Sequence, residues 1–327
     1  MINREVLRII TARGAGDATL RKIGRFAADN PACSLTDLCD SVEEMCSLGV
    51  SRTAAGNIYE NREQAAVLEE QLCQNQVDMC WIGNEEFPEG LKNSRAGSTP
   101  AVLFYRGNFN LLKNRCVGFT GSRKVSDSGI RITEEAAGEL AAEGVTVVSG
   151  YANGVDITAH RAALLSGGNT VFVLVEGILK SRVKSEIREL LEEGNHLFLS
   201  QFSPNLTWSA ANAMKRNGTI IGLSDAMILI ESAMDGGTFQ AGQQTLKSGK
   251  PLFVVDYGGG KPTAEGNDFF LKQGGVPLRG DRNGKPVLKK VYAALEKKEE
   301  TEKKAGQSGS EETDSEAPYE QMSLRLS

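Results

Sequence analysis

Two glycine-containing loops hold the residues whose types and spacing are best suited to chemistry. Gly121 and Gly150 each follow an apolar, β-branched run, and a helical pattern begins after each loop. Such loops present backbone N–H groups and a helix N-terminus to phosphate. Arg123 adds a cation whose planar donor fork matches phosphate oxygens, and Ser122 and Ser149 add hydroxyl groups. These residues predict phosphate binding at the ends of adjacent strands.

The elements that must position these loops alternate between residues 115 and 277. Short β-branched runs separated by helical patterns are typical of a parallel, doubly wound α/β sheet with helices on both faces. Ligands of such sheets bind at the carboxyl ends of the strands, near the switch point. The predicted strands are 117–120, 145–149, 170–175, 196–200, 226–230 and 251–255, and the predicted helices are 129–143, 156–166, 183–193, 210–223 and 239–248.

Three regions are predicted: an N-terminal helical domain at 1–76, an α/β domain at 77–295 and a tail at 296–327. Strands are also expected at 77–82 and 101–106. The helical domain contains RGAGDATLRKIGRF and CSLGVSRTAAGNIY, two degenerate stretches like helix-hairpin-helix motifs, which contact DNA phosphates through turn amides. Ordinary helix ends are the alternative interpretation, since short motifs occur by chance.

Composition narrows the class of protein. The chain has 327 residues and a net charge of −5. Residues 296–327 contain nine acidic and five basic residues, which leaves about −1 for residues 1–295, and a near-neutral body can carry a local basic patch. No apolar run approaches a membrane span. The six cysteines form no CxxC pair and only two histidines occur, so we expect no metal, reduced thiols and a cytoplasmic location.

Several separate motifs resemble one protein family. They are TGSRKVSDSG (120–129), SGYANGVDITAHRAALLSGGNTVFVL (149–174), RNGTIIGLSDAMILIES (216–232) and GNDFFLKQGG (266–275), whereas the dinucleotide fingerprint GxGxxG is absent after the first strand. This set is similar to the DNA-processing protein A (DprA/Smf) family. The resemblance implies an extended Rossmann-like fold that binds single-stranded DNA, forms a homodimer and loads DNA for the recombinase RecA, in natural transformation (competence) or related recombination.

The resemblance also implies site residues. Arg123 matches the arginine of the family's G-S-R loop, and Asp156, which we expect to cap the helix after it, matches the family's aspartate. We expect the DNA contacts to come from Gly121, Ser122, Arg123, Ser149, Gly150, Asn153, Arg216 and Asn217.

The chain departs from the family pattern where Asn153 and Gly218 stand in place of arginines and where KSRVK replaces a tyrosine-proline pair. Fewer phosphate contacts predict weaker binding with a flatter salt dependence. Positive charge could be restored by Lys180, Arg182 and Lys184, although a solvated helix start explains these three residues equally well.

Single-strand binding also needs surfaces on which bases stack. Tyr151 and Trp208 lie beside the predicted loops, whereas Phe119 lies on a strand and is expected in the core. Contacts to the backbone and stacking carry no base code, so little sequence preference is expected.

An enzyme of the same broad fold is the alternative. Related nucleotide phosphoribohydrolases carry P-G-G-x-G-T-x-x-E, but this chain reads MDGGTFQAGQQ, with Gln243 or Gln244 where a carboxylate is needed. Without that acid, general acid–base chemistry on a ribosyl bond has no obvious residue. We therefore expect a binding protein with no cofactor. A nucleotide-binding module that uses the same groove remains open.

The end of the chain carries one more motif. After a helix predicted near 287–298, the acidic, apolar-poor stretch GQSGSEETDSEAP is expected to be disordered. It is followed by Gln321, Met322, Leu324 and Leu326, which match the Q-x-x-L-x-L peptide that docks into the bacterial replicative sliding clamp. A terminal stretch with no role is the alternative.

Overall fold

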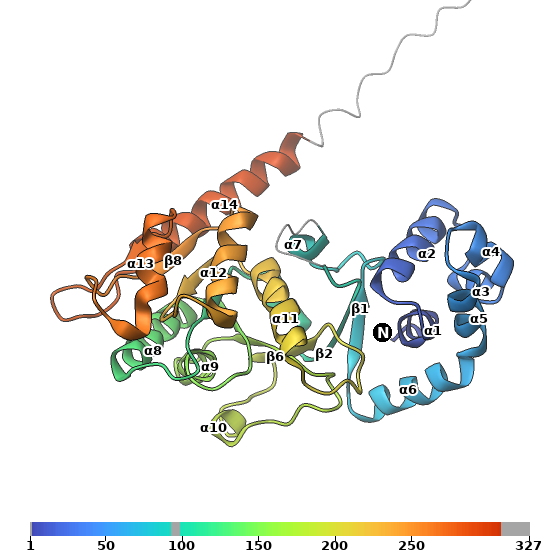
Figure 1. The fold of residues 1–327 in the computed structure, drawn as a ribbon, viewed down its shortest axis with the longest axis horizontal. Coiled ribbons are helices and arrows are strands. Elements are labelled where there is room, and N and C mark those ends of the chain that lie inside the picture. The colour runs from blue at the N-terminus through green and yellow to red at the C-terminus, as the bar shows by residue number, and fades with distance from the viewer. Residues whose placement is uncertain (1, 93–98, 309–327) are drawn as a thin grey trace, which may run out of the picture. The chain divides into compact units, whose positions relative to one another are not determined.

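Nine strands form one mixed sheet in the computed structural model, which describes residues 2–92 and 99–308 (Figure 1). The strand order is β1-β2-β6-β5-β4-β3-β7-β8-β9. β2 pairs antiparallel with β1 and β6, and the other neighbours are parallel. The strands are β1 Asp78–Trp81, β2 Val102–Gly107, β3 Cys116–Thr120, β4 Thr146–Ser149, β5 Thr170–Val173, β6 His196–Ser200, β7 Ala226–Leu229, β8 Leu252–Val255 and β9 Val276–Leu278. The predicted strands are confirmed, and only β9 was not expected.

Helices alternate with the parallel strands, as predicted. The helices at the five predicted positions are α8 Asp127–Ala142, α9 Val155–Leu165, α10 Ser185–Arg188, α11 Ala210–Leu223 and α12 Gly236–Ser248. Helices α7 Glu89–Lys92 and α13 Glu265–Lys272 and the 3-10 turns η1 Phe109–Lys113 and η2 Pro262–Ala264 were not predicted. α10 is much shorter than the predicted 183–193, because the acidic residues at 189, 192 and 193 would lie at the unfavourable C-terminal end of a longer helix. α12 begins at Gly236, ahead of the predicted start.

The sheet has its switch point between β3 and β7. Every residue of β4, β5, β7 and β8 is buried, which explains why these strands are continuous apolar or β-branched runs. From β3 the chain crosses through α8 to β4 on one side, and from β7 it crosses through α12 to β8 on the other. The carboxyl ends of β3 and β7 therefore diverge into a crevice.

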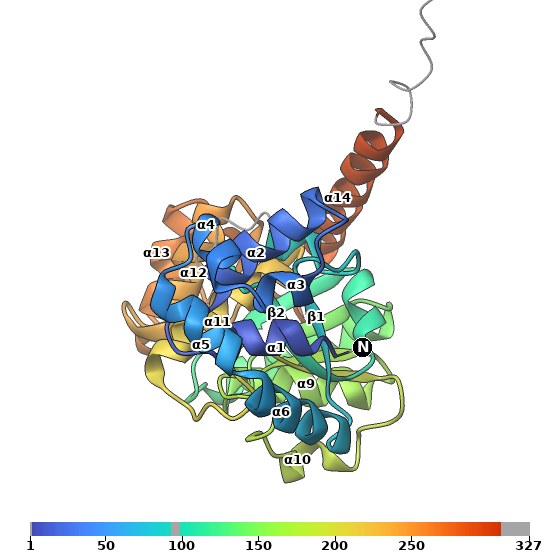
Figure 2. The same ribbon diagram turned by 90° about the vertical axis from the view of Figure 1, so that its right-hand side faces the viewer.

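The N-terminal region folds into six helices, seen in blue in Figure 2. Asn3, Ser34, Ser41 and Ser51 each accept a hydrogen bond from a first-turn amide, so side-chain caps start four of them. The helices are α1 Arg4–Thr11, α2 Asp17–Asp29, α3 Leu35–Cys39, α4 Val42–Ser47, α5 Arg52–Glu60 and α6 Arg62–Gln74.

The two stretches that resemble helix-hairpin-helix motifs form two helix pairs that support each other. α1 and α2 join at a turn with Gly14 at φ 84°, and α4 and α5 join at a turn with Gly49 at φ 78°. Asn57 of the second pair donates to the Arg13 carbonyl of the first turn (2.8 Å), and Lys22 of the first pair donates to the Gly49 carbonyl (2.9 Å). The turns are thus fixed reciprocally; a DNA contact by them stays a prediction.

The chain divides into two units, Met1–Leu288 and Lys289–Ser327. The second contains α14, Lys289–Ser308, so the helix predicted near 287–298 continues through residues 299–308, where a disordered tail was predicted. Glu299 and Glu300 precede Lys303 and Lys304 by four residues, a spacing that favours a helix despite low hydrophobicity. The boundaries 1–76, 77–295 and 296–327 stay predictions. In the ranges that the structure describes, no helix combines the length and apolarity needed to cross a membrane.

Candidate functional site

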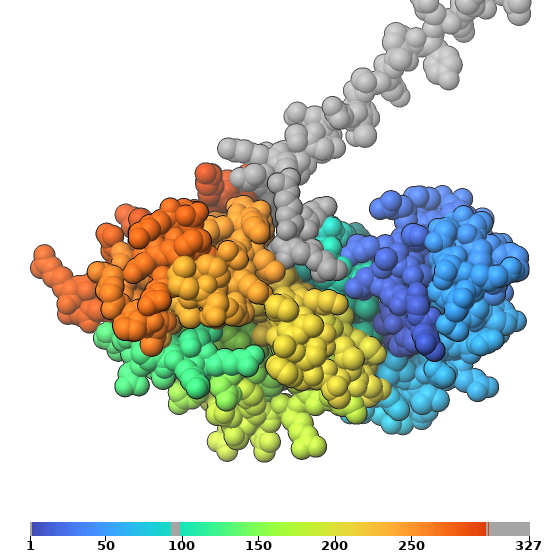
Figure 3. Space-filling model, in the orientation of Figure 1, coloured from blue at the N-terminus to red at the C-terminus, as the bar shows by residue number. Residues whose placement is uncertain are grey.

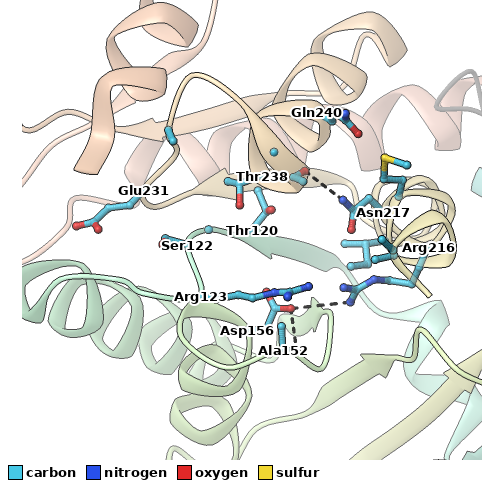
Figure 4. A pocket seen from close by; sticks show the side chains of 18 of the residues that line it. Thr120, Ser122, Arg123, Ala152, Asp156, Arg216, Asn217, Glu231, Thr238 and Gln240 are labelled. Carbon is cyan, nitrogen blue, oxygen red and sulfur yellow. Dashed lines mark hydrogen bonds and ion pairs between the residues drawn. The ribbon is translucent and has the colours of Figure 1, made fainter. Parts of the chain in front are cut away.

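A cleft of about 600 Å³ opens at the switch point (Figure 4). Its walls are the loop after β3, the segment from the end of β7 into α12, and one face of α11. In the space-filling view, α11 and the residues before it form a yellow surface block that borders the orange residues around α12 (Figure 3). The walls include Thr120, Gly121, Ser122, Arg123, Lys124, Asp156, Trp208, Met214, Arg216, Asn217, Gly237 and Thr238.

The loop after β3 presents two cations to this cleft. The Ser122 amide donates to the Glu231 carbonyl (2.9 Å), and the Ser122 carbonyl accepts from the Val155 amide (3.3 Å). The Lys124 amide donates to Ser122 Oγ (3.0 Å). These bonds use backbone groups of the loop that were predicted to bind phosphate. The exposed side chains of Arg123 and Lys124 are therefore what this loop offers to an anion.

A carboxylate of the protein itself occupies the N-terminus of α8. Ser126 caps this helix, and its amide donates to Glu231 Oε2 (3.1 Å) while its hydroxyl donates to Glu231 Oε1. Lys261 Nζ lies 2.7 Å from Glu231 Oε1 and donates to Ser126 and Ser128. Glu231 is fully buried and points away from Arg123 and Arg216 (Figure 4). The helix N-terminus at which a Rossmann-type protein holds a phosphate is thus occupied by the Glu231 carboxylate.

The electrostatics of Glu231 follow from this arrangement. Burial by itself raises the pKa of the carboxyl group, but hydrogen bonds from Lys261 and Ser126 outweigh it, so the pKa lies below its ordinary value of 4.5. The Tyr257 hydroxyl donates to Glu231 Oε1 (3.2 Å). Burial is the main reason why the pKa of this phenol is raised, and the negative charge of Glu231 raises it further. The Glu231 carboxylate is therefore ionised and paired at neutral pH.

The loop after β4 is buried and holds other residues in place. Ser149 Oγ lies 2.8 Å from the Phe119 carbonyl and 3.0 Å from Asp156 Oδ1, so its hydroxyl is already engaged. A Cβ on the buried Gly150 would overlap the guanidinium of Arg216 and the carboxylate of Asp156. Ser149 and Gly150 line neither described cavity, and they support the site from behind.

Asp156 does not cap α9, which corrects the sequence prediction. The N-cap is Gly154, without a side-chain bond. Asp156 Oδ2 instead accepts from the Ala152 amide (3.2 Å) and lies 3.9 Å from Arg216 Nη1. Burial raises the pKa of Asp156, and the Arg216 charge partly opposes that rise. The reason is tertiary: α11 brings Arg216 against this carboxylate.

Arg216 is almost wholly enclosed, with 5% of its surface exposed. Its Nη1 donates to the Val173 carbonyl (3.0 Å), whereas its buried Nε has no hydrogen-bond partner within the described residues. Figure 4 shows Arg123 and Arg216 facing each other, with Asp156 beneath them. Of the two arginines predicted from the family motifs, Arg123 is accessible and Arg216 forms part of the floor.

The buried His160 fastens the same loop. Its Nε2 lies 2.6 Å from the Gly150 carbonyl, and its Nδ1 lies 2.6 Å from Thr170 Oγ1. Burial lowers its pKa to about 3, so the ring is neutral and Nε2–H donates to the carbonyl. The histidine therefore positions the loop, and its partners lie outside its own helix.

The α11 wall combines polar and apolar groups. Asn217 donates from Nδ2 to the Gly237 carbonyl at the start of α12 (3.2 Å). Trp208, 55% exposed, and Met214, 43% exposed, also face the cleft. Met214 was missed because a methionine on a helix usually signals core packing. Phe119 is fully buried, as predicted.

A second cavity of about 410 Å³ contains the remaining predicted groups that lie near the site. Lys184 Nζ donates to Asn153 Oδ1 (3.0 Å) and lies 4.8 Å from the centre of the Tyr151 ring. The Tyr151 hydroxyl accepts from the Lys184 amide (2.7 Å), and its ring packs edge-on against Phe172 and Phe198. The Tyr151 ring is thus held in place by packing and by a hydrogen bond, and one of its faces lies near the Lys184 ammonium group.

The other predicted residues lie elsewhere. Lys180 and Arg182 are exposed and line neither cavity. The clamp-type peptide at Gln321, Met322, Leu324 and Leu326 lies outside the described residues. Within the ranges 2–92 and 99–308, no three histidine, cysteine or acidic side chains come close enough to hold a metal ion.

Sequence comparisons agree with this architecture. The family model for DNA recombination-mediator protein A matches residues 78–283. The chain is 33% identical to protein Smf of Escherichia coli over 180 residues, which cover 54% of this chain and 48% of that protein. It is 34% identical to DNA processing protein DprA of Streptococcus pneumoniae over 157 residues, covering 48% and 55%. The chain spans about half the length of these relatives.

Solved structures share the fold. The structure of DprA from Streptococcus pneumoniae superposes with a TM-score of 0.70 at 23% identity, covering 85% of this chain and 95% of that one. DprA from Helicobacter pylori, in a structure concerned with its single-stranded DNA binding mode, gives a TM-score of 0.54 at 25% identity, covering 62% and 90%. Together with the family match over more than half of its length, these findings show that the chain belongs to the DNA recombination-mediator protein A (DprA/Smf) family.

Proposed function

We propose that this protein binds single-stranded DNA in the cleft between β3 and β7, without catalysis. One observation carries the proposal: accessible Arg123 and Lys124 line the same opening as an exposed tryptophan and methionine. A groove lined by both cations and flat or apolar side chains suits a strand whose backbone is charged and whose bases have flat faces that stack. The single-stranded DNA binding described for the Helicobacter pylori relative supports the same ligand class.

Binding of this kind is largely independent of base sequence. Arg123 and Lys124 suit phosphate oxygens, which are identical at every position of a strand. Trp208 and Met214 offer surfaces on which any base can pack, since every base has a π-face. The proposed function is therefore general strand binding.

The structure gives less support to the nucleotide-hydrolysing alternative. Among the acidic residues of the cleft, Glu231 is enclosed by Lys261, Ser126 and Tyr257. Asp156 has a raised pKa, but its oxygens accept from Ser149 and Ala152 and it faces Arg216. Neither of these two carboxyl groups is free to protonate a leaving base, so a hydrolytic mechanism would depend on Asp235, the exposed acidic residue that lines the cleft at the start of α12. If the chain releases free base from a nucleoside monophosphate, the non-catalytic proposal fails.

Wider roles rest on the family resemblance. We propose that the bound strand is passed to RecA, in transformation or related recombination, and that the protein acts as a homodimer in the cytoplasm. Docking of the terminal peptide on the sliding clamp is a separate proposal. Pull-down of the clamp by the full chain, but not by a chain without residues 321–327, tests it; equal pull-down by both would reject it.

Affinity is expected to be modest. Asn153 lies at the rim where the family carries an arginine, and Lys184 donates to its side chain, so one ammonium group is present there. Lys180 and Arg182 add no charge to either cavity wall. Each phosphate contact on a single strand contributes about 0.7 to the slope of log affinity against log salt. A shallow salt dependence is therefore expected.

Fluorescence anisotropy with labelled oligo-dT, a mixed-sequence single strand and the matching duplex tests the proposal across a salt series. We expect similar binding of both single strands, weaker binding of the duplex and a shallow slope. Preference for the duplex would overturn the proposal. A steep, tight interaction with oligo-dT would overturn only the expectation of modest affinity.

A further inference from the structure

The cleft and the second cavity share one boundary. Arg123, Lys124, Ala152, Trp208 and Arg216 line both of them. Met214 and Asn217 belong only to the first cavity, and Tyr151 and Lys184 belong only to the second. The two spaces are therefore neighbouring compartments of one groove, with a cationic and aromatic boundary between them.

The boundary is suited to an anion. Arg123 is exposed and makes no ion pair in the described part of the chain, whereas the Arg216 charge lies just behind with one nitrogen unpartnered. Trp208 lies at the same boundary, with more than half of its surface exposed. A phosphate placed here would meet the guanidinium of Arg123, and the tryptophan ring would be within reach of groups on either side.

Each compartment is large enough for a small ligand. The volumes, about 600 and 410 Å³, fall within the range of about 300–1,000 Å³ typical of small-molecule pockets. The first compartment adds apolar surface from Met214 and Ala213. The second adds the Lys184 ammonium beside the Tyr151 ring, together with the Asn153 amide. Both therefore combine apolar surface with polar groups, as a nucleoside requires.

We propose that the two compartments hold two successive nucleotides of one strand, and that Arg123 contacts the phosphate that links them, beside Trp208. This inference rests on the proposed single-strand binding and specifies its minimal ligand. A mononucleotide fills one compartment and lacks a linking phosphate diester, whereas a dinucleotide occupies both. The groove thereby selects polymer over free nucleotide.

Trp208 provides a local reporter for the test. The chain has two tryptophans, and the Trp81→Phe variant leaves Trp208 as the only one. Quenching of its fluorescence is titrated with thymidine 5′-monophosphate, with the 5′-phosphorylated thymidine dinucleotide and with long oligo-dT. We expect the dinucleotide to bind about tenfold more tightly than the monophosphate, because a second stacked base and the linking phosphate are added.

Two substitutions fill one compartment each. Ala210→Leu adds three heavy atoms to the first only, and Asn153→Phe adds three heavy atoms to the second only. Each should weaken dinucleotide binding about tenfold, toward the affinity of the monophosphate. Ala211→Leu is the matched control, since Ala211 is an exposed neighbour on α11 that lines neither compartment. Circular dichroism melting confirms that the variants fold.

The outcomes separate this inference from the function on which it rests. If long oligo-dT binds but the dinucleotide binds no more tightly than the monophosphate, the two-compartment inference is overturned and strand binding stands. Unchanged dinucleotide affinity in either filled variant also overturns it. If no oligonucleotide of any length binds, the proposed function fails and the inference fails with it. The first comparison needs no cavity substitution, so a misfolded variant does not remove the test.

Discussion

The loops after β3 and β4 look alike in sequence but have different roles in the structure. Each places a glycine after an apolar strand and leads into a helix. The loop after β3 carries Arg123 and Lys124 at the open surface. The loop after β4 is packed beneath, where Ser149 and Gly150 are buried against Asp156 and Arg216. Similar local sequences therefore gave one loop with exposed side chains and one buried loop that supports it, because different residues pack behind each.

Substitutions of Arg216 and Arg123 test the difference between the supporting loop and the accessible loop most strongly. Arg216→Ala should lower the free energy of unfolding by about 3 kcal/mol, because it leaves the buried Asp156 without its partner. Arg123→Ala should change stability by less than about 0.5 kcal/mol and weaken single-strand binding about tenfold, as expected for a charge-assisted contact to phosphate. Urea unfolding and anisotropy measure the two effects. The division is wrong if Arg123→Ala is the more destabilising change.

Gly150 gives a second test, on the supporting loop alone. Gly150→Ala should destabilise the fold by about 2 kcal/mol, since the added Cβ forces Arg216 and Asp156 apart. Gly237→Ala is the matched control, because the nearest atom to its added Cβ is Asn217 Nδ2 at 3.9 Å. Urea unfolding compares the variants. Equal stability of the two would show that the loop after β4 has room to move.

Glu231 tests how the loop after β3 is held. Its folded pKa lies below 4.5, so its stabilising effect is complete above that pH and is lost as the pH falls through the folded pKa. Glu231→Gln should cost about 1.5 kcal/mol at pH 7 and flatten the loss of stability in acid. Chemical unfolding from pH 7 to pH 3 measures both effects.

The matched control for that experiment is Glu265→Gln, an exposed acidic residue on α13. Its loss of stability between pH 7 and pH 3 should match that of the wild-type protein. An acid profile of Glu231→Gln that is as steep as that of the wild type would mean that the buried cluster does not couple stability to pH.

Lys184 should produce the smallest effect. Lys184→Met should weaken single-strand binding about threefold and reduce the salt slope by about 0.7, the contribution of one contact. Lys180→Met should change neither quantity, because Lys180 lies outside both cavities. Salt-titrated anisotropy distinguishes them. Equal losses for both variants would favour a diffuse field over a defined contact at Asn153.

Most of the fold could be predicted from local pattern. Runs such as those of β4, β5 and β8 are buried along their whole length, so they stand out as continuous apolar segments. α10 and the end of α14 were harder, because their boundaries depend on balances of charge that hydrophobic periodicity does not record. The order of the strands and the antiparallel β2–β6 pairing depend on contacts far apart in the chain.

The site was predictable only in part. Arg123 and Trp208 were predicted as site residues, and both line the cleft. Polar or large side chains on exposed loops remain accessible, so their position in the sequence is enough to predict them. The assignment of Asp156 as a helix cap was wrong, since Arg216 approaches it from 60 positions along the chain. Glu231 and Lys261 gave no usable signal, because their pairing joins the end of β7 to the η2 turn.

The sequence by itself determined that this chain builds a doubly wound sheet with two glycine loops at the ends of neighbouring strands, since periodicity and glycine placement are local properties. Only the tertiary structure decided which loop faces the groove. Glu231 filled the N-terminus of α8, and Arg216 closed the space above Gly150. Whether a polar group is available to a ligand depends on burial and on its other partners, and distant residues supply both.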